Sequence, residues 1–283
     1  MAMNLLAAKR RRAALAIALM LVMSVVFTTK ACADGTEPLT PEDRNRRVLN
    51  VTLTGVGVVT AWGVANWDYF SGKPQAKSEG WFGRNTEEGG VDKLGHVFAT
   101  YATAQGISSL FEHWCFTPEE AAWYGSLSSF AILGVMEAGD SFSDYGFSYE
   151  DLIANALGGI ASYYRYRYPD LASKVDLRWE IGFDPGQVDV LTDYENSKYL
   201  VALKLNGFEQ FNKGILKHVE LHAGYFTRGY SEASAPDERN LYMGIGLNLT
   251  DLFRRSGHRK LATALNYYQP PGTYLAIENK LAD

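Results

Sequence analysis

The spacing of hydrophobic residues changes near residue 178 and divides the chain into two kinds of structure. Before this point, long and mostly apolar stretches separated by loop residues are typical of helices. The clearest helix start is Thr117 followed by Pro118, which places an N-cap residue before a first-turn proline. The pattern predicts four helices, at residues 48–66, 92–114, 118–138 and 148–167.

After residue 178, apolar and polar residues alternate, which is typical of strands with one apolar face. Leu241, Met243 and Ile245, for example, face away from Tyr242. The pattern predicts about five strands, near residues 179–183, 198–206, 218–225, 241–249 and 274–277, and a short helix over 258–268. The expected fold class is therefore α+β, with an N-terminal bundle of about four helices followed by a small antiparallel β-sheet.

The first 33 residues have the three parts of an export signal. The basic stretch Lys9–Arg12 precedes the apolar run Ala13–Phe27, and small residues flank Cys32 before the expected cleavage site at Asp34. The apolar run has 15 residues, fewer than a membrane span needs. Two alternatives stay open, namely an uncleaved signal anchor and a lipoprotein that carries its lipid on Cys32.

The expected organisation follows from these patterns. It comprises a signal peptide (1–33), a linker (34–47), a helical domain (48–168), an antiparallel β region (169–256) and a C-terminal tail with a short helix and a possible strand (257–283). The export signal predicts that the protein is located in the periplasm or at the outer membrane. We also expect it to associate with a membrane.

The charge of the chain excludes an electrostatic nucleic-acid partner. The net charge is −5, and removal of residues 1–33 leaves 22 Lys and Arg against 32 Asp and Glu, a net charge of −10. Such an acidic chain lacks the basic footprint of nucleic-acid or anionic-lipid binding. Cys115 would be the only cysteine left after cleavage before Asp34, so we expect it to be a buried, inert thiol.

The four predicted helices raise the question of membrane spans. Their charge-free runs shorten along the chain, and the last two are short for a span. Arg44, Arg46 and Arg47 also lie on the flank that an export signal would place outside the cytoplasm, against the positive-inside rule. These features favour a compact bundle in or against the envelope, and an integral bundle of four spans remains the alternative.

Polar residues placed within the apolar helices are the best candidates for a site. Asp92 and His96 are four residues apart on one helix face, and so are Asp151 and Asn155. Several buried ionisable groups are costly unless they pair or share a purpose, so we expect one polar cluster. Taken singly, Asp92 could be an N-cap and Asp151 the acid of a capping box. The full candidate set is Asp92, Lys93, His96, Glu137, Asp140, Asp144, Asp151 and Asn155.

Metal binding is the weaker interpretation of these residues. His96, Glu137 and Asp151 are the candidate ligands, but the chain has no tight metal motif, and no cofactor is identified. A second possibility is the alternation of His218, Glu220 and His222 on one strand face. The plainer interpretation of that pattern is the solvated face of an amphipathic strand.

Three motifs resemble known families. They are Gly90-Val91-Asp92-Lys93-Leu94-Gly95-His96, Glu137-x-x-Asp140, and Ser148-x-x-Asp151-x-x-x-Asn155-x-x-Gly158. In this order they resemble the YfiM-type family of predicted bacterial periplasmic lipoproteins, and more distantly the VanZ-like membrane family of glycopeptide resistance. The resemblance covers about residues 67–169 and implies an envelope location, but no activity.

The leading hypothesis is therefore a non-enzymatic binding or structural module of the cell envelope, with a lipid, glycan or protein partner. The second is a hydrolase or transferase acting on an envelope lipid or glycan, with Glu137 or Asp151 as general base and His96 as acid or ligand. The third is a polytopic membrane protein of the VanZ-like type.

The processing of the chain can be tested directly. We expect N-terminal sequencing of the exported protein to start at Asp34, because the small residues before it fit signal peptidase. A lipid-blocked Cys32 as first residue would contradict this expectation in favour of a lipoprotein, and an intact Met1 would indicate a signal anchor.

Overall fold

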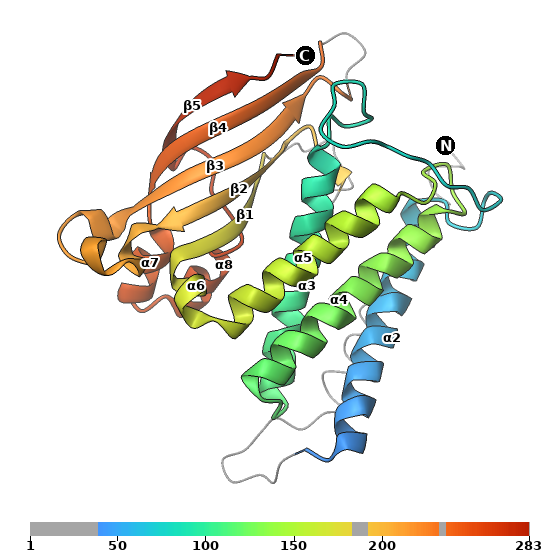
Figure 1. Cartoon of the computed structure of the whole chain (residues 1–283), viewed down its shortest axis with the longest axis horizontal. Coiled ribbons are helices and arrows are strands. Elements are labelled where there is room, and N and C mark those ends of the chain that lie inside the picture. The colour runs from blue at the N-terminus through green and yellow to red at the C-terminus, as the bar shows by residue number, and fades with distance from the viewer. Residues whose placement is uncertain (1–38, 183–191, 232–235, 283) are drawn as a thin grey trace, which may run out of the picture. The chain divides into compact units, whose positions relative to one another are not determined.

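The computed structural model describes residues 39–182, 192–231 and 236–282 (Figure 1). Within these residues the chain forms two compact units. The helical unit contains residues up to Ser78 together with Ala99–Arg167, and the sheet unit contains Glu79–Phe98 together with the chain from Tyr168 onward. The predicted α+β class is confirmed. The predicted signal peptide lies outside the described residues.

The four predicted helices are present, and local capping explains where they start. Their bounds are α2 Pro41–Asn66, α3 Val91–His113, α4 Pro118–Asp140 and α5 Tyr149–Arg167. Thr117 caps α4, since its hydroxyl accepts from the backbone N–H of Glu120 while the Glu120 carboxylate accepts from Thr117. The Ser148 hydroxyl accepts from the backbone N–H of Asp151 in the same way at the start of α5.

Helix α2 starts earlier than its apolar run. The Thr40 hydroxyl accepts from the backbone N–H of Asp43, and Pro41 occupies the first turn, where its missing N–H costs no hydrogen bond. Residues 41–47, expected as linker, therefore form the first turns of this helix. The hydrophobic pattern could not predict this start of α2, because charged residues in a first helical turn have the same composition as a solvated loop.

Small and hydroxylated residues pack the helices of the helical unit. Helices α2 and α5 both pack against α4 (Figure 1). A Cβ on Gly125 would lie 2.1 Å from the Ser108 hydroxyl and 2.8 Å from its backbone nitrogen, so only glycine allows this approach. Hydrogen bonds also cross the interfaces, from Thr52 to the Ser128 hydroxyl and from Ser129 to the Thr100 carbonyl. Interhelical contact thus depends on polar and small side chains as well as apolar ones.

The sheet unit contains five antiparallel strands in sequential order. Three short α-helices accompany them, two of which, α6 and α7, the pattern did not predict, and three 3₁₀ helices, η2 Leu205–Gly207, η3 Glu209–Phe211 and η4 Leu216–His218, precede β3. The elements are α6 Pro169–Lys174, β1 Val175–Ile181, β2 Ser197–Lys204, β3 Val219–Arg228, β4 Glu238–Leu247, α7 Leu249–Arg255, α8 Arg259–Ala264 and β5 Tyr274–Lys280. The Asn248 side chain starts α7 by accepting from the backbone N–H of Asp251.

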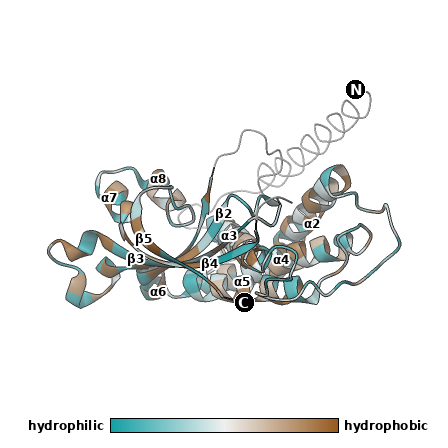
Figure 2. Ribbon diagram, turned by 90° about the horizontal axis from the view of Figure 1, so that it is seen from above, coloured by the Kyte–Doolittle hydropathy of each residue, from teal (hydrophilic) through white to brown (hydrophobic). Residues whose placement is uncertain are grey.

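The two faces of this sheet have opposite environments from those expected. Glu220 and His222 share one face, as predicted, but they are 0% and 2% exposed, so the expectation of a solvated face is wrong. The chain after α8 covers this face, where Gln269 contacts Arg178. The other face is apolar, and hydrophobic residues recur along its strands (Figure 2). Tyr199 and Tyr225 on this face are buried against Val91, while the aliphatic side chains further along it are open to solvent. We call it the aliphatic face; its exposed members are Val201, Leu221, Leu241, Met243, Ile245, Leu247, Leu275 and Ile277.

Cys115 is not the inert thiol expected from the sequence. It is disulfide-bonded and half-buried, in a left-handed backbone conformation with φ of 71° directly after α3. The only other cysteine in the sequence, Cys32, lies outside the described residues.

Two glycine substitutions test the packing of the helical unit. We expect Gly125→Ala to lower the free energy of unfolding by about 1–3 kcal/mol, because the new methyl group meets the backbone of Ser108. Gly106→Ala is the matched control, since Gly106 is exposed on α3 with nothing within 4 Å of the added Cβ. It should raise stability by about 0.5–1 kcal/mol through helix propensity. Equal effects of the two in thermal or denaturant unfolding would contradict the close approach.

Candidate functional site

Two predicted site residues of the helical unit meet in its interior. Asn155 on α5 donates from Nδ2 to Oε1 of Glu137 on α4, at 3.4 Å. The hydroxyl of Thr100 on α3 donates to Oδ1 of Asn155, at 2.8 Å. All three side chains are at most 1% exposed. The Asn155 amide thus uses both its donor and its acceptor, and we call this arrangement the Thr100–Asn155–Glu137 network.

The remaining candidates of the helical unit differ in how they relate to this network. Asp151 is buried in the first turn of α5, where a carboxylate is favourable beside the helix N-terminus. Burial, followed by the charge and hydrogen bond of Asp140, raises the pKa of Tyr69, which places Asp140 beside that phenol. Asp144 is exposed. Asp151 also lies beside Glu137, with carboxylate oxygens of the two residues within 4.8 Å of each other, whereas the exposed Asp144 has no place in a buried cluster.

The sheet unit holds Asp92 and Lys93 in a buried ion-pair group. Lys93 is 2% exposed and lies 2.6 Å from Oδ2 of Asp92, and it also contacts the Glu79 carboxylate. Burial, followed by the negative charges of Asp92 and Glu87, raises the pKa of Glu88 to about 7. Glu88 therefore binds a proton near neutral pH, while Lys93 pairs with Asp92 and Glu79.

His96 is half-buried on α3, one helical turn before Thr100. Side chains four residues apart lie on the same helix face, so His96 follows the face that carries Thr100. A joint site of His96, Glu137 and Asp151, with or without a metal, stays a prediction.

A second buried network, which the sequence analysis did not identify, lies in the sheet unit. Arg178 on β1 contacts both oxygens of Glu220, at 2.6 and 3.0 Å, and Oδ2 of Asp176, at 3.0 Å. Lys204 pairs with the other oxygen of Asp176, at 2.8 Å, and Nε2 of His222 lies 2.8 Å from Glu220. The available signal was the alternation of Asp176, Arg178 and Glu180, which places three charges on one strand face.

The arrangement around Glu220 favours its charged form. Burial alone would raise the pKa of this carboxyl, but the hydrogen bond from His222 and the charge of Arg178 outweigh burial and lower it. Two opposite charges held so closely are typical of a structural ion pair. Gly224 leaves room for an aromatic ring beside this network, since a Cβ there would lie 2.3 Å from the Tyr242 ring.

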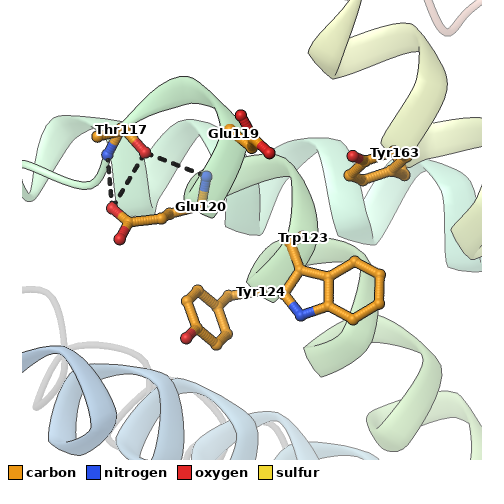
Figure 3. A pocket seen from close by; sticks show the side chains of 6 residues that line it. All are labelled: Thr117, Glu119, Glu120, Trp123, Tyr124 and Tyr163. Carbon is orange, nitrogen blue, oxygen red and sulfur yellow. Dashed lines mark hydrogen bonds between the residues drawn. The ribbon is translucent and has the colours of Figure 1, made fainter. Parts of the chain in front are cut away.

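A pocket of about 310 Å³ opens at the start of α4 (Figure 3). Its walls include Trp123 and Tyr163, whose ring centroids are 6.0 Å apart with an edge-to-face arrangement. Its carboxylates are engaged elsewhere, Glu120 with Arg44 at 3.1 Å and Glu119 with Arg167 at 3.3 Å. The pocket therefore offers aromatic rings and ion-paired carboxylates to a ligand, and its lining residues do not include a free nucleophile or general base.

Fold and site together define the class of protein. It is an α+β protein with buried polar networks and exposed aliphatic surfaces. Residues 78–167 match the model of a family described as "Predicted periplasmic lipoprotein (DUF2279)", which accounts for less than half of the chain. This description supports an exported, periplasmic protein. No curated protein matches the chain, and no solved structure does.

A double-substitution cycle tests the Thr100–Asn155–Glu137 network. Glu137→Ala and Asn155→Ala should each lower the unfolding free energy by about 1–3 kcal/mol, because each leaves a buried polar partner unsatisfied. The double variant should cost less than the two singles together. Asp144→Ala, at an exposed acid, is the control and should change stability by less than about 0.5 kcal/mol. Additive effects of the two network substitutions would contradict their coupling.

Proposed function

We propose that this chain is an exported protein of the cell envelope whose helical unit lies in a phospholipid membrane and carries the Thr100–Asn155–Glu137 network as a polar binding site. The observation that carries this proposal is the orientation of α5. One stripe of this helix is exposed by 44–53% and consists of Tyr149, Ile153, Leu157, Ile160 and Tyr164.

The opposite side of α5 is buried and polar. It contains Asp151, Asn155 and Ser162, together with Gly158. A surface helix of a water-soluble protein shows the reverse arrangement, with its apolar stripe toward the core. In a membrane, small and polar residues form the helix contacts, while aliphatic residues face the lipid.

Helix α2 has the same character. By length and composition, it is the one helix of the described part of the chain that could cross a membrane, with a mean hydropathy of 1.6. Only 11% of this apolar stretch is buried, and Leu49 and Leu53 are 56% and 57% exposed. The core helix of a soluble protein would be mostly buried, so this exposure supports contact with lipid.

Aromatic residues lie at both ends of the helical unit. Trp123 and Tyr164 are at least half exposed at the end where α4 begins and α5 finishes. Phe70, Tyr145 and Tyr149 are exposed at the other end, where α5 begins. Such rings are typical of the two membrane–water interfaces, where an apolar body and a polar tip are both accommodated.

The polar network has a ready role in this setting. An ionisable residue such as Glu137 is costly inside a membrane protein unless it serves a ligand or a structural pairing. The network offers a carboxylate, an amide and a hydroxyl, which favours hydrogen-bonded recognition of a polar group on an envelope lipid or glycan. The position of His96, one turn before Thr100, supports hydrolysis or group transfer as the second candidate, with His96 as the acid.

Membrane fractionation tests the proposal. We expect the protein to stay in the membrane pellet after alkaline carbonate extraction, both as the unsubstituted chain and with Cys32→Ala, which removes any lipid on that residue. Ile153→Lys together with Leu157→Lys should shift it out of the pellet, since a lysine in the membrane centre costs about 2.5–3.5 kcal/mol.

Asp144→Lys is the control, because this exposed residue lies in the turn after α4. Release of the protein without the lysine substitutions by carbonate would contradict membrane embedding and indicate a peripheral protein. Release by buffer alone would indicate a protein of the aqueous periplasm.

A further inference from the structure

We propose that the sheet unit has its own binding surface for an anionic phospholipid bilayer, formed by the aliphatic face and by an adjacent basic end of the sheet. The inference rests on the proposed membrane location and adds a second, independent lipid contact to it. Both parts of the surface belong to the sheet unit.

The aliphatic face is continuous across the strands. The register places Ala223 of β3, Met243 of β4 and Ile277 of β5 side by side. The next row toward the basic end contains Ile245 and Leu275. These side chains are far from buried, with Met243 73%, Ile245 60%, Leu275 84% and Ile277 82% exposed. Soluble monomers rarely expose a contiguous apolar patch of this kind.

The buried side of the sheet explains why this face must point outward. Side chains alternate along a strand, so burial of Arg178, Glu220 and His222 on one face places their neighbours on the other. Turning the aliphatic face inward would expose this ion-pair network and would break its contact with Gln269. The aliphatic face is thus a fixed outer surface of the sheet.

Positive charge gathers at the end of the sheet where β4 finishes and β3 begins. Asn248, just after β4, donates its backbone N–H to the carbonyl of His218, just before β3. Exposed hydrophobic side chains lie at this end as well, with Ile215 80% and Leu216 44% exposed. We call it the basic end; its cations are Lys213 and Lys217 before β3, and Arg254, Arg255, Arg259 and Lys260 on α7 and α8, which pack together and lead into the segment over the charged face.

The balance of charge at this end is opposite to that of the whole chain. Acids at this end include Glu209, Asp251 and Asp170 of α6, of which Asp251 is engaged by Arg255, at 2.6 Å, and Asp170 by Lys174, at 2.7 Å. Cations next to exposed aliphatic residues match a bilayer surface, where the apolar side chains enter the acyl boundary and the cations meet lipid phosphates. The net negative charge of the whole chain argued against binding to anionic surfaces, but it does not reveal this local group of cations.

Composition favours lipid over a protein partner. The centres of protein interfaces are enriched in Tyr, Trp and Arg, which provide most of the binding energy. The exposed hydrophobic members of the aliphatic face are Val, Leu, Ile and Met, with Asn279 beside Leu241 on the edge strand, and the tyrosines of this face, Tyr199 and Tyr225, are buried. Contact with lipid acyl chains requires apolar surface area but no specific shape, and aliphatic side chains provide such area.

Photo-crosslinking in the full-length protein identifies what contacts the face. A diazirine amino acid is placed at Ile277, whose side chain belongs to the aliphatic face, or at Ala276, the exposed neighbour on the opposite side of β5. The protein is irradiated in its native membrane and in vesicles of phosphatidylglycerol and phosphatidylethanolamine, and the adducts are identified by mass.

We expect lipid adducts when the diazirine is at position 277 and none when it is at position 276. Crosslinks from 277 to a second copy of the chain, or to another protein, would overturn the proposal in favour of a protein interface. Equal labelling by water at both positions, with no lipid adduct, would also overturn it.

The basic end has its own test. The test uses a combined variant, Lys213→Ser, Arg254→Ser, Arg259→Ser and Lys260→Ser. In vesicles with phosphatidylglycerol at low ionic strength, each lost cation should lower membrane partitioning by about fivefold, so the yield of lipid adducts at position 277 should fall. In phosphatidylcholine vesicles, the same variant should behave as the parent. An equal yield from variant and parent in anionic vesicles would overturn the role of the basic end.

The outcome is separable from that of the proposed function. A protein that resists carbonate extraction but gives no lipid adduct at 277 retains its membrane-embedded helical unit and loses the second contact. Lipid adducts at 277 in a protein that carbonate releases would show the reverse, a peripheral protein held by its sheet.

Discussion

The guanidinium of Arg178 is the group on which the sheet unit depends. It is buried, and it holds Asp176 of its own strand β1 and Glu220 of β3, across the intervening β2, at hydrogen-bond distance on one face. Removing one partner of such a network leaves an unpaired charge in a medium that solvates it poorly, which costs about 3–5 kcal/mol. The network therefore fixes which face of the sheet is inside, and the aliphatic face is outside as a consequence.

The helical unit obeys the same constraint by different means. Its interior contains an amide, a carboxylate and several hydroxyls, each of which must find a partner once it leaves water. Asn155 lies between Thr100 and Glu137 and bonds with both, while Gly125 lets the backbones of α3 and α4 approach closely. Polar groups inside and aliphatic groups outside form the arrangement that a membrane requires, and this supports the proposed location.

Net charge and charge distribution lead to different conclusions about partners. The acidity of the chain excludes a large basic footprint, yet the loops at one end of the sheet concentrate cations next to exposed Ile215 and Leu216. Electrostatic attraction falls off within about 10 Å at moderate ionic strength, so the local group acts on a surface that it touches while distant acids are screened. A surface of this kind is visible only when loops separated in sequence are brought together.

The sequence by itself determined what depends on neighbouring residues. The start of α4 at Thr117 was predictable because a capping box is closed by residues three apart, and the alternation along β4 was predictable because strand geometry repeats every second residue. The pairing of Glu137 with Asn155 was predicted only as part of a larger cluster, since their faces were known but not the packing of α4 against α5. The burial of Glu220 and His222 was decided by tertiary structure alone. Alternation defines two faces but does not say which is covered, and only the contact of Arg178 with Gln269, 91 residues away, placed the charged face inside.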